Sequence, residues 1–237
     1  MAKAPVTKLK KKEIIWLSKN LCKKHSMDYL SHFSCYLKEI VKNPDYEHQR
    51  GTDMPMLNKV GFIDLENLGF QSDFGLVLSY AILDDETGEI LGRPITKKEL
   101  NTCMDEKLVR DCVRDMSKFD KLIGFYSSKH DIPYIRSKAV FYKIPFPRYG
   151  EIIHQDLYYT IKYKFKLSRN SQQTAYNILV GESHKTHWGR DQWLKAVTQG
   201  DKKSLEYIWE HNQIDVRELR ELYHKVDKFT MRSDRSM

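Results

Sequence analysis

The chain has 237 residues, of which 41% are hydrophobic and 12% aromatic, so it can bury a full core as one medium-sized domain with or without an appendage. Its apolar runs are too short for a transmembrane helix or a signal-peptide core, and four cysteines are too few for a disulfide scaffold, so we expect an intracellular, cytoplasmic protein. The formal charge of +8 favours polyanionic partners, either nucleic acid or an anionic membrane surface.

The N-terminal part, residues 1–57, divides into three segments. Residues 8–12 contain four lysines and form a basic arm, whereas apolar residues recur at helical spacing over residues 13–42. Residues 43–57 carry Asn, Asp, Gly and two Pro, which is typical of a linker. We therefore expect a small helical extension ahead of a main domain that spans residues 58–237.

The helical extension contains two thiols and two imidazoles in a nearly symmetric order. The pattern is Cys22-x2-His25-x6-His32-x2-Cys35. Two Cys and two His can hold one Zn²⁺ ion in a tetrahedral site, so these four residues are candidate zinc ligands. The six-residue gap is shorter than the usual zinc-finger loop, and the alternative interpretation is two buried thiols and two surface imidazoles beside the core.

The main domain alternates strands with helices. The apolar residues Val60, Phe62 and Ile63 predict the first buried strand. Further strands are expected at residues 75–83, 88–95, 121–126 and 150–155, and helices at residues 97–118, 130–142 and 204–228. Three antiparallel strands, followed by two strands that helices separate, predict an α/β fold of the ribonuclease-H-like type, with a mixed five-stranded sheet and flanking helices.

Two carboxylates, Asp64 and Glu66, close the first strand two residues apart. Side chains alternate across a strand, so both acids project from one face. Unpaired carboxylates beside a core are costly, and a hard divalent cation such as Mg²⁺ or Mn²⁺ would offset that cost because it prefers carboxylate oxygen. A surface turn with two solvated acids is the alternative interpretation.

Two further acids fit the same site. Asp131 opens the helix after the fourth strand, where the helix macrodipole alone would also favour an acid. Asp215 lies in the last helix, where an exposed acid paired with a nearby arginine is the alternative. His211 precedes Asp215 by four residues, so one helical turn brings the two side chains together. Acids from three separate elements favour a metal site over independent surface acids.

Three motifs occur in order between residues 59 and 226: Phe62-Ile-Asp-Leu-Glu66, then Gly124-Phe-Tyr with His130-Asp-Ile-Pro133, then His211-Asn-Gln-Ile-Asp-Val216. In these motifs the chain resembles the DEDD superfamily of 3′→5′ exonucleases, and in particular stand-alone nucleases related to the proofreading domains of family-B DNA polymerases. Residues 22–36 also resemble the leader of some of these proteins. The resemblance implies a ribonuclease-H-like nuclease that hydrolyses nucleic acid, with single-stranded DNA favoured over RNA and no membrane partner.

The resemblance also implies two-metal hydrolysis, in which two Mg²⁺ or Mn²⁺ ions about 4 Å apart clamp the scissile phosphate and lower the pKa of a bound water. Asp64 would bridge both ions, and Asp131 would support one of them. Glu66 and Asp215 would hold the ion that carries the attacking water. His211 could orient or deprotonate that water, because an unperturbed histidine titrates near pH 6.5.

Candidate substrate-binding residues follow the fourth strand. Tyr126 could stack on a base, and Lys129 and Arg136 could contact the phosphate backbone. The family commonly has Asn just after this strand, where the present chain has Ser127 after Tyr126, so Ser127 is the fourth candidate substrate contact. A second departure concerns His211, because one DEDD subclass has Tyr four residues before the last Asp and the other has His five residues before it.

Three other functions fit the same sequence. They are a structure-selective endonuclease on this fold, a non-catalytic nucleic-acid-binding or polymerase-accessory module, and a small zinc-binding interaction protein. The presence of all four acids argues against the non-catalytic module, because a decayed site would be expected to have lost one of them.

Overall fold

The computed structural model describes residues 59–184 and 189–230, with the short stretches 17–18, 28–29, 35 and 235–236. The basic arm, the linker and three of the expected zinc ligands, Cys22, His25 and His32, lie outside the described residues. The fourth expected ligand, Cys35, has helical backbone and is half-buried. The zinc site and the boundary near residue 58 therefore stay predictions.

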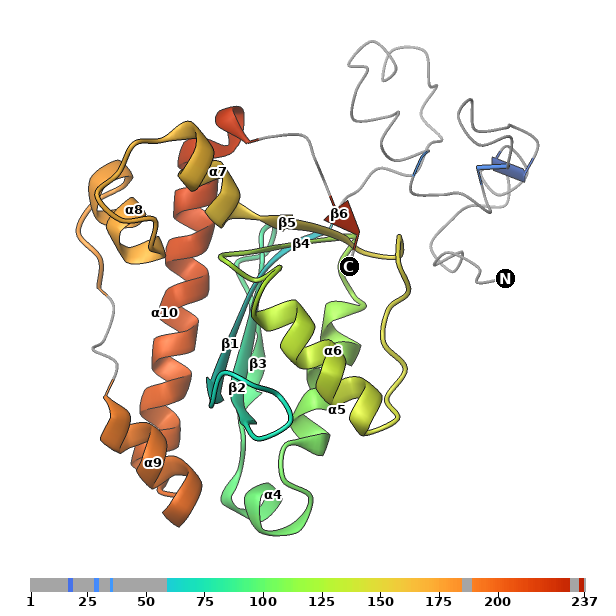
Figure 1. The fold of residues 1–237 in the computed structure, drawn as a ribbon, viewed down its shortest axis with the longest axis vertical. Helices are drawn as coiled ribbons and strands as arrows, with labels where there is room; N and C mark the ends of the chain where they lie inside the picture. Colours follow the sequence, from blue (N-terminus) through green and yellow to red (C-terminus); the bar gives the residue numbers. More distant parts are fainter. Residues whose placement is uncertain are drawn as a thin grey trace.

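The domain is built on one six-stranded sheet with strand order β3-β2-β1-β4-β5-β6 (Figure 1). The strands are β1 (Val60–Leu68), β2 (Leu76–Asp84), β3 (Ile90–Pro94), β4 (Lys121–Gly124), β5 (Ile153–Asp156) and β6 (Arg235–Ser236). β1, β2 and β3 form an antiparallel meander, whereas β1, β4 and β5 run parallel. The five expected strands and the ribonuclease-H-like α/β fold are confirmed, and the two-residue β6 adds an antiparallel edge.

The first strand is longer than its apolar run and carries both acids within it. β1 pairs with β2 from Gly61 to Leu68, with a bulge after Glu66. β4 pairs only with residues 60–62 of β1, so β1 extends past the end of its parallel neighbour. The acids therefore lie in an extended, half-covered part of the sheet, and the alternative of a surface turn is wrong.

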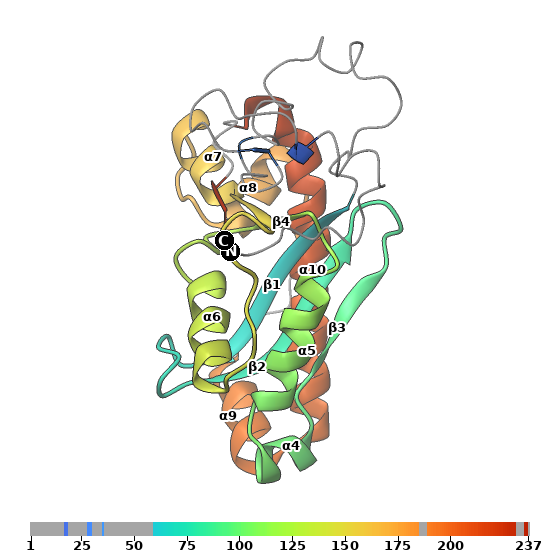
Figure 2. The same ribbon diagram turned by 90° about the vertical axis from the view of Figure 1, so that its right-hand side faces the viewer.

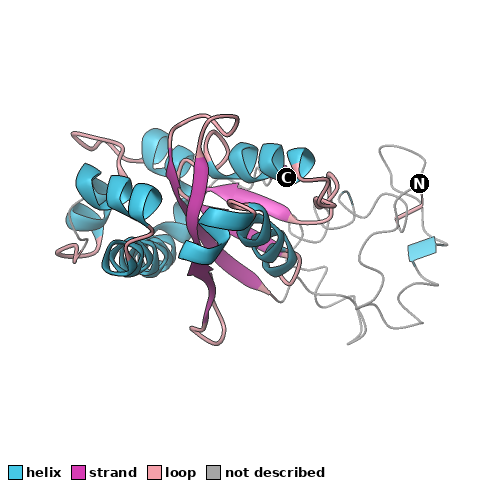
Figure 3. Cartoon of the chain, turned by 90° about the horizontal axis from the view of Figure 1, so that it is seen from below, coloured by secondary structure: helices cyan, strands magenta, loops and turns pink. Residues whose placement is uncertain are grey.

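Helices cover both faces of the sheet (Figures 2 and 3). They are α4 (Lys97–Thr102), α5 (Glu106–Met116), α6 (Asp131–Phe141), α7 (Leu157–Lys164), α8 (Gln172–Leu179), α9 (Arg190–Gln199) and α10 (Lys202–Val226), with the 3₁₀ turn η3 (Asp227–Phe229). Phe62 packs with apolar residues of α10 on one face, whereas Ile63 and Leu65 pack with those of α5 and α6 on the other. Among the described helices, none is both long and apolar enough to cross a bilayer.

The single helix expected over residues 97–118 is two helices, and that prediction is wrong. Helix α4 ends at Thr102 and α5 begins at Glu106, with Met104 in the left-handed region at φ 54°. The fully buried carboxylate of Asp105, in the break, accepts hydrogen bonds from Val77 N, Lys138 Nζ and Tyr142 Oη. These partners are distant in sequence, so helical periodicity could not reveal them.

Candidate active site

Asp64 and Glu66 project from the face of β1 that α10 covers, as their alternation with Phe62 requires. Phe62 lies in the α10 core and its ring meets that of Tyr223 at a centroid distance of 5.5 Å. This apolar contact therefore fixes the position of α10 along β1. It brings the middle of α10, where His211 and Asp215 lie, opposite the two acids.

Asn212 is a site residue that the sequence reasoning missed. Its side-chain amide is fully buried, donates to Asp64 Oδ2 over 2.7 Å, and accepts from Ser79 Oγ on β2 over 3.2 Å. A buried amide must find partners on both its oxygen and its nitrogen. Asn212 therefore orients the Asp64 carboxylate, and a polar residue on the apolar face of α10, four residues before Val216, was the available signal.

Glu66, His211 and Asp215 form the tightest part of the site. The Nε2 atom of His211 lies 3.7 Å from Glu66 Oε1 and 4.0 Å from Asp215 Oδ2. The imidazole is held from behind by the buried Trp193, whose ring it meets edge-on at 5.8 Å. Gln172 of α8 donates to the backbone carbonyl of Asp215 over 2.9 Å and so ties this turn of α10 to its neighbour.

Asp131 reaches the site from the first turn of α6. Its carboxylate accepts a hydrogen bond from Leu65 N, between the two strand acids, over 3.2 Å. Burial, followed by the charges of Asp156 and Asp215, raises the pKa of Asp131 to about 7, although the hydrogen bond from Leu65 opposes the shift. All four acids named from the sequence thus come together on β1, α6 and α10.

The turn between β4 and α6 is fastened by a further acid, Asp156. One of its oxygens accepts from Tyr126 N over 2.7 Å, and the other accepts from Ser128 N over 2.9 Å and from the Ser128 hydroxyl. Tyr126 has a positive φ of 60°, a conformation that L-residues adopt only when their surroundings enforce it. Asp156 therefore fixes the backbone conformation of the turn that leads to Asp131.

The expected substrate-binding residues are divided by the structure. Tyr126 and Lys129 are exposed on the turn before Asp131. Arg136 is also exposed, with its guanidinium over the ring of Phe146 at 5.5 Å. Ser127, in contrast, is fully buried and its hydroxyl lies 2.9 Å from His154 Nε2. Its side chain holds the turn from within, so we do not retain it as a substrate contact.

The donor set suits a hard divalent cation. Glu66, His211 and Asp215 each offer one ligand atom, and these atoms lie within 4.8 Å of one another. Asp64 adds a carboxylate on the same face of β1, and Asp131 adds one from α6. Carboxylate oxygens with a single imidazole nitrogen are ligands that Mg²⁺ and Mn²⁺ accept.

Comparisons with known proteins agree with this fold. Residues 61–227 match the RNase_H superfamily. A similar solved structure is the family B DNA polymerase from the hyperthermophilic archaeon Pyrobaculum calidifontis, with a TM-score of 0.56 and 17% sequence identity over 73% of this chain. The chain spans only 25% of that polymerase chain, and a search of curated proteins gives no match. Since the match covers most of the chain and contains all four acids, the protein belongs to the RNase_H superfamily.

Proposed function

We propose that the protein is a metal-dependent 3′→5′ exonuclease of the DEDD type that hydrolyses single-stranded DNA. The observation that carries the proposal is the convergence of four carboxylates from β1, α6 and α10, with Asp131 bonded to the backbone between the two strand acids. Chain segments 65 or more residues apart are folded so that their acids meet. Carboxylates this close together repel one another and lower the stability of the fold, unless bound cations neutralise their charge.

Asp64, Glu66, Asp131 and Asp215 would hold two Mg²⁺ or Mn²⁺ ions, which when bound would activate water and stabilise the charge that develops on the phosphate. Asn212 holds the Asp64 carboxylate in a fixed orientation through its 2.7 Å hydrogen bond. The backbone of Leu65 does the same for Asp131. Both contacts fix ligand geometry before substrate arrives.

His211 is placed to act on a water at the Glu66–Asp215 side of the site. Its Nε2 atom lies 3.7 Å from Glu66 Oε1 and 4.0 Å from Asp215 Oδ2, so a water bound beside either carboxylate would lie within reach of the imidazole. We propose that His211 orients this water or accepts its proton. Trp193 behind the ring limits its rotation and so keeps Nε2 directed at the acids.

A row of tyrosines near the site supports a nucleic-acid strand as the substrate. Tyr126 meets Tyr158 at 4.9 Å, Tyr158 meets Tyr159 at 5.2 Å, and Tyr159 stacks on Tyr163 at 6.1 Å. Lys162 Nζ lies over the rings of Tyr158 and Tyr163. Aromatic rings interleaved with cations suit unpaired bases and phosphates. The similar polymerase is a DNA enzyme, which favours DNA over RNA.

Digestion of end-labelled oligonucleotides tests the proposal. Single-stranded and duplex DNA and RNA of one sequence would each be labelled at the 5′ end and incubated with Mn²⁺ or Mg²⁺. A ladder that shortens stepwise from the 3′ end, fastest on single-stranded DNA and abolished by chelator, is the expected result. Internal cuts would replace the proposal with an endonuclease, and intact substrate at high enzyme concentration would leave a binding module.

A further inference from the structure

Asp131 meets β1 at a part of the strand that lies beyond its parallel neighbour. In the described part of the chain, β4 pairs with β1 only over residues 60–62. The backbone N–H of Leu65 lies past that pairing and donates to Asp131 Oδ1 over 3.2 Å. The other acids of the site repel the Asp131 carboxylate whenever they are charged, so a single hydrogen bond has to hold it against that repulsion.

A second contact joins the residue after Glu66 to the residue before Asp131. Asn67 Oδ1 and His130 Nε2 lie 2.9 Å apart, although the two residues are 63 positions apart in the sequence. The Nδ2 atom of Asn67 donates to the backbone carbonyl of Gly69, which can only accept, so the amide oxygen is the atom that faces His130. The imidazole therefore carries its proton on Nε2 and donates it to Asn67.

The His130 ring is also held by its aromatic neighbours. It is half-buried, and it meets the ring of Phe70 at 6.4 Å and the ring of Tyr134 at 5.7 Å. Tyr134 lies one turn further along α6, is buried, and places its hydroxyl 3.5 Å from the carbonyl oxygen of Leu68. We call Asn67 and His130, with the hydrogen bond between them, the β1–α6 clasp. The clasp ties the end of β1 to the start of α6.

We infer that the β1–α6 clasp positions Asp131: it keeps the carboxylate at the Leu65 amide and so fixes the separation between Asp131 and Glu66. Asn67 and His130 are positioning residues, because each acts through the acid next to it in the chain. Residues that orient metal ligands in this way are typically worth about 10- to 100-fold in metal affinity. That consequence for metal binding rests on the proposed function, whereas the positioning of Asp131 stands on the contacts alone.

Hydrogen exchange of the Leu65 amide, followed by NMR on the full chain in chelator, tests the positioning directly. His130→Phe keeps an aromatic ring beside Phe70 and Tyr134 but removes the donor, whereas His130→Gln keeps a donor. In His130→Phe the Leu65 amide should exchange about 2- to 12-fold faster, the range for loss of one hydrogen bond, and His130→Gln should keep the wild-type rate. Unchanged exchange of Leu65 in His130→Phe would overturn the inference.

A control amide and a double variant separate the clasp from a general loosening of the sheet. Lys59 N donates to Asp120 Oδ2 over 3.2 Å at the other end of β1, and its exchange should be the same in every variant. Asn67→Leu should reproduce the effect of His130→Phe, and the double variant should be no worse than either single variant, because all three lose the same bond. Faster exchange at Lys59 as well, or additive effects in the double variant, would overturn the clasp.

Calorimetric titration with Mn²⁺, in the absence of nucleic acid, tests the consequence for the metal site. His130→Phe and Asn67→Leu should each weaken Mn²⁺ binding about 10- to 100-fold, and His130→Gln should stay near the wild-type affinity. Wild-type Mn²⁺ affinity in a variant whose Leu65 amide exchanges faster would overturn the link between the clasp and the metal. Faster exchange of Leu65 in the variants, with no Mn²⁺ binding by the wild type, would support the clasp and overturn the proposed nuclease.

Discussion

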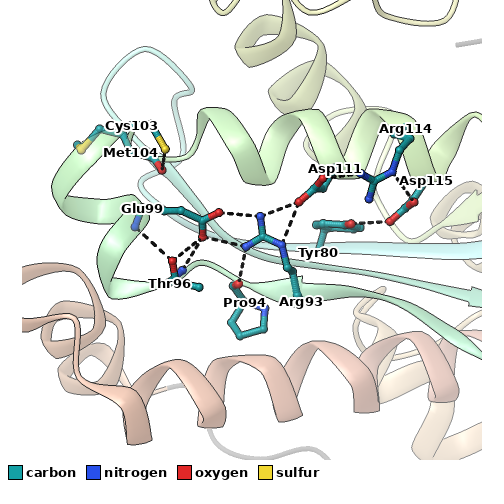
Figure 4. A network of polar contacts seen from close by, with 10 residues as sticks. All are labelled: Tyr80, Arg93, Pro94, Thr96, Glu99, Cys103, Met104, Asp111, Arg114 and Asp115. Carbon is teal, nitrogen blue, oxygen red and sulfur yellow. Dashed lines mark hydrogen bonds and ion pairs between the residues drawn. The ribbon is translucent and has the colours of Figure 1, made fainter.

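The candidate site and a second polar cluster both gather several carboxylates, but with different partners. The second cluster, which we call the arginine network, lies between β3, α4 and α5 and includes Arg93, Glu99, Asp111, Arg114 and Asp115 (Figure 4). The guanidinium of Arg93 lies 2.8 Å from Glu99 and 2.7 Å from Asp111. At the candidate site the contacting groups are instead an amide, an imidazole and a backbone N–H.

The two clusters shift carboxyl pKa values in opposite directions. Burial raises the pKa of Glu99, but its hydrogen bonds from Arg93 and Thr96 outweigh burial and leave the pKa below its ordinary value. Asp115 follows the same pattern, with Lys118, Tyr80 and Arg114 as its partners. For Asp131, burial and neighbouring acids prevail and the pKa rises to about 7. With Lys118 included, three cations of the arginine network balance its three carboxylates. The carboxylates of the candidate site would, on the proposed function, be balanced by bound divalent cations.

The largest contrast is expected when one acid in each cluster is neutralised. Asp64→Asn and Asp215→Asn should lower the nuclease rate on the order of 10⁴-fold or more, because each removes a proposed metal ligand. The metal-free protein should melt at the same temperature or higher, since repulsion between acids is relieved. Asp111→Asn, the control in the arginine network, should lower the melting temperature and keep the rate per folded molecule. Hydrolysis rates and thermal melts with and without Mn²⁺ measure these effects. A near wild-type rate in the Asp64 or Asp215 variant would exclude that residue from the site.

His211 gives the next largest effect. His211→Ala should slow hydrolysis about 10²- to 10⁴-fold with little change in oligonucleotide affinity, because it removes a group that acts on water rather than on the strand. His211→Tyr should recover part of the rate, since a phenol can still position water. His224, thirteen residues further along α10 and paired with Asp85, is the matched control, and His224→Ala should leave the rate unchanged. Equal rates in both alanine variants would make His211 a structural residue.

The four acids of the candidate site could be predicted from the sequence, whereas the residues that hold those acids in position could not. The order and spacing of short sequence motifs reveal the four acids, Asp64, Glu66, Asp131 and Asp215. Asn212 was missed because its value depends on Ser79 and Asp64, which the fold alone brings to it. Ser127 was misjudged for a related reason, because only the pairing of β4 with β5 shows that it faces His154.

The fold shows the same division between local and long-range information. Apolar runs marked β1, β2 and β4, whose apolar residues are largely buried. The signal was weaker for β3, which is half-buried along its whole length, and for β5, which has one apolar residue. The break between α4 and α5 was not marked, because Asp105 is set by partners on β2 and α6 rather than by helix propensity. The extension of β1 past its apolar run was likewise decided by pairing with β2.

His154 shows the effect of burial on a pKa in a group whose shift is not dominated by a charged partner. Burial lowers its pKa to about 4, with Asp156 opposing the shift and Arg136 adding to it, whereas an unfolded histidine titrates near 6.5. The folded protein therefore disfavours the charged form of His154. The contribution of this residue to the free energy of unfolding is fully present above about pH 6.5 and is lost as the pH falls toward 4. The loss should reach about 3 kcal/mol at pH 4. His154→Gln, which can still bond Ser127, should remove this slope in urea unfolding between pH 7 and 4; parallel curves for the two proteins would contradict it.

Arg93→Met should give the smallest effect and tests the arginine network directly. It should lower the free energy of unfolding by about 1–3 kcal/mol at pH 7, because Glu99 and Asp111 lose a shared partner while Arg93 itself is only partly buried. The bridge between Arg110 and Glu106 is exposed, and Arg110→Met should change stability by less than about 0.5 kcal/mol. Arg93 holds the pKa of Glu99 below its unfolded value, so this stabilisation is present above that value and fades as the pH falls through it. The difference between wild type and Arg93→Met should therefore shrink as the pH falls through about 4. A difference that stays constant to pH 3 would mean that Arg93 stabilises through packing rather than charge, and the contrast with the candidate site would then rest on Asp115 alone.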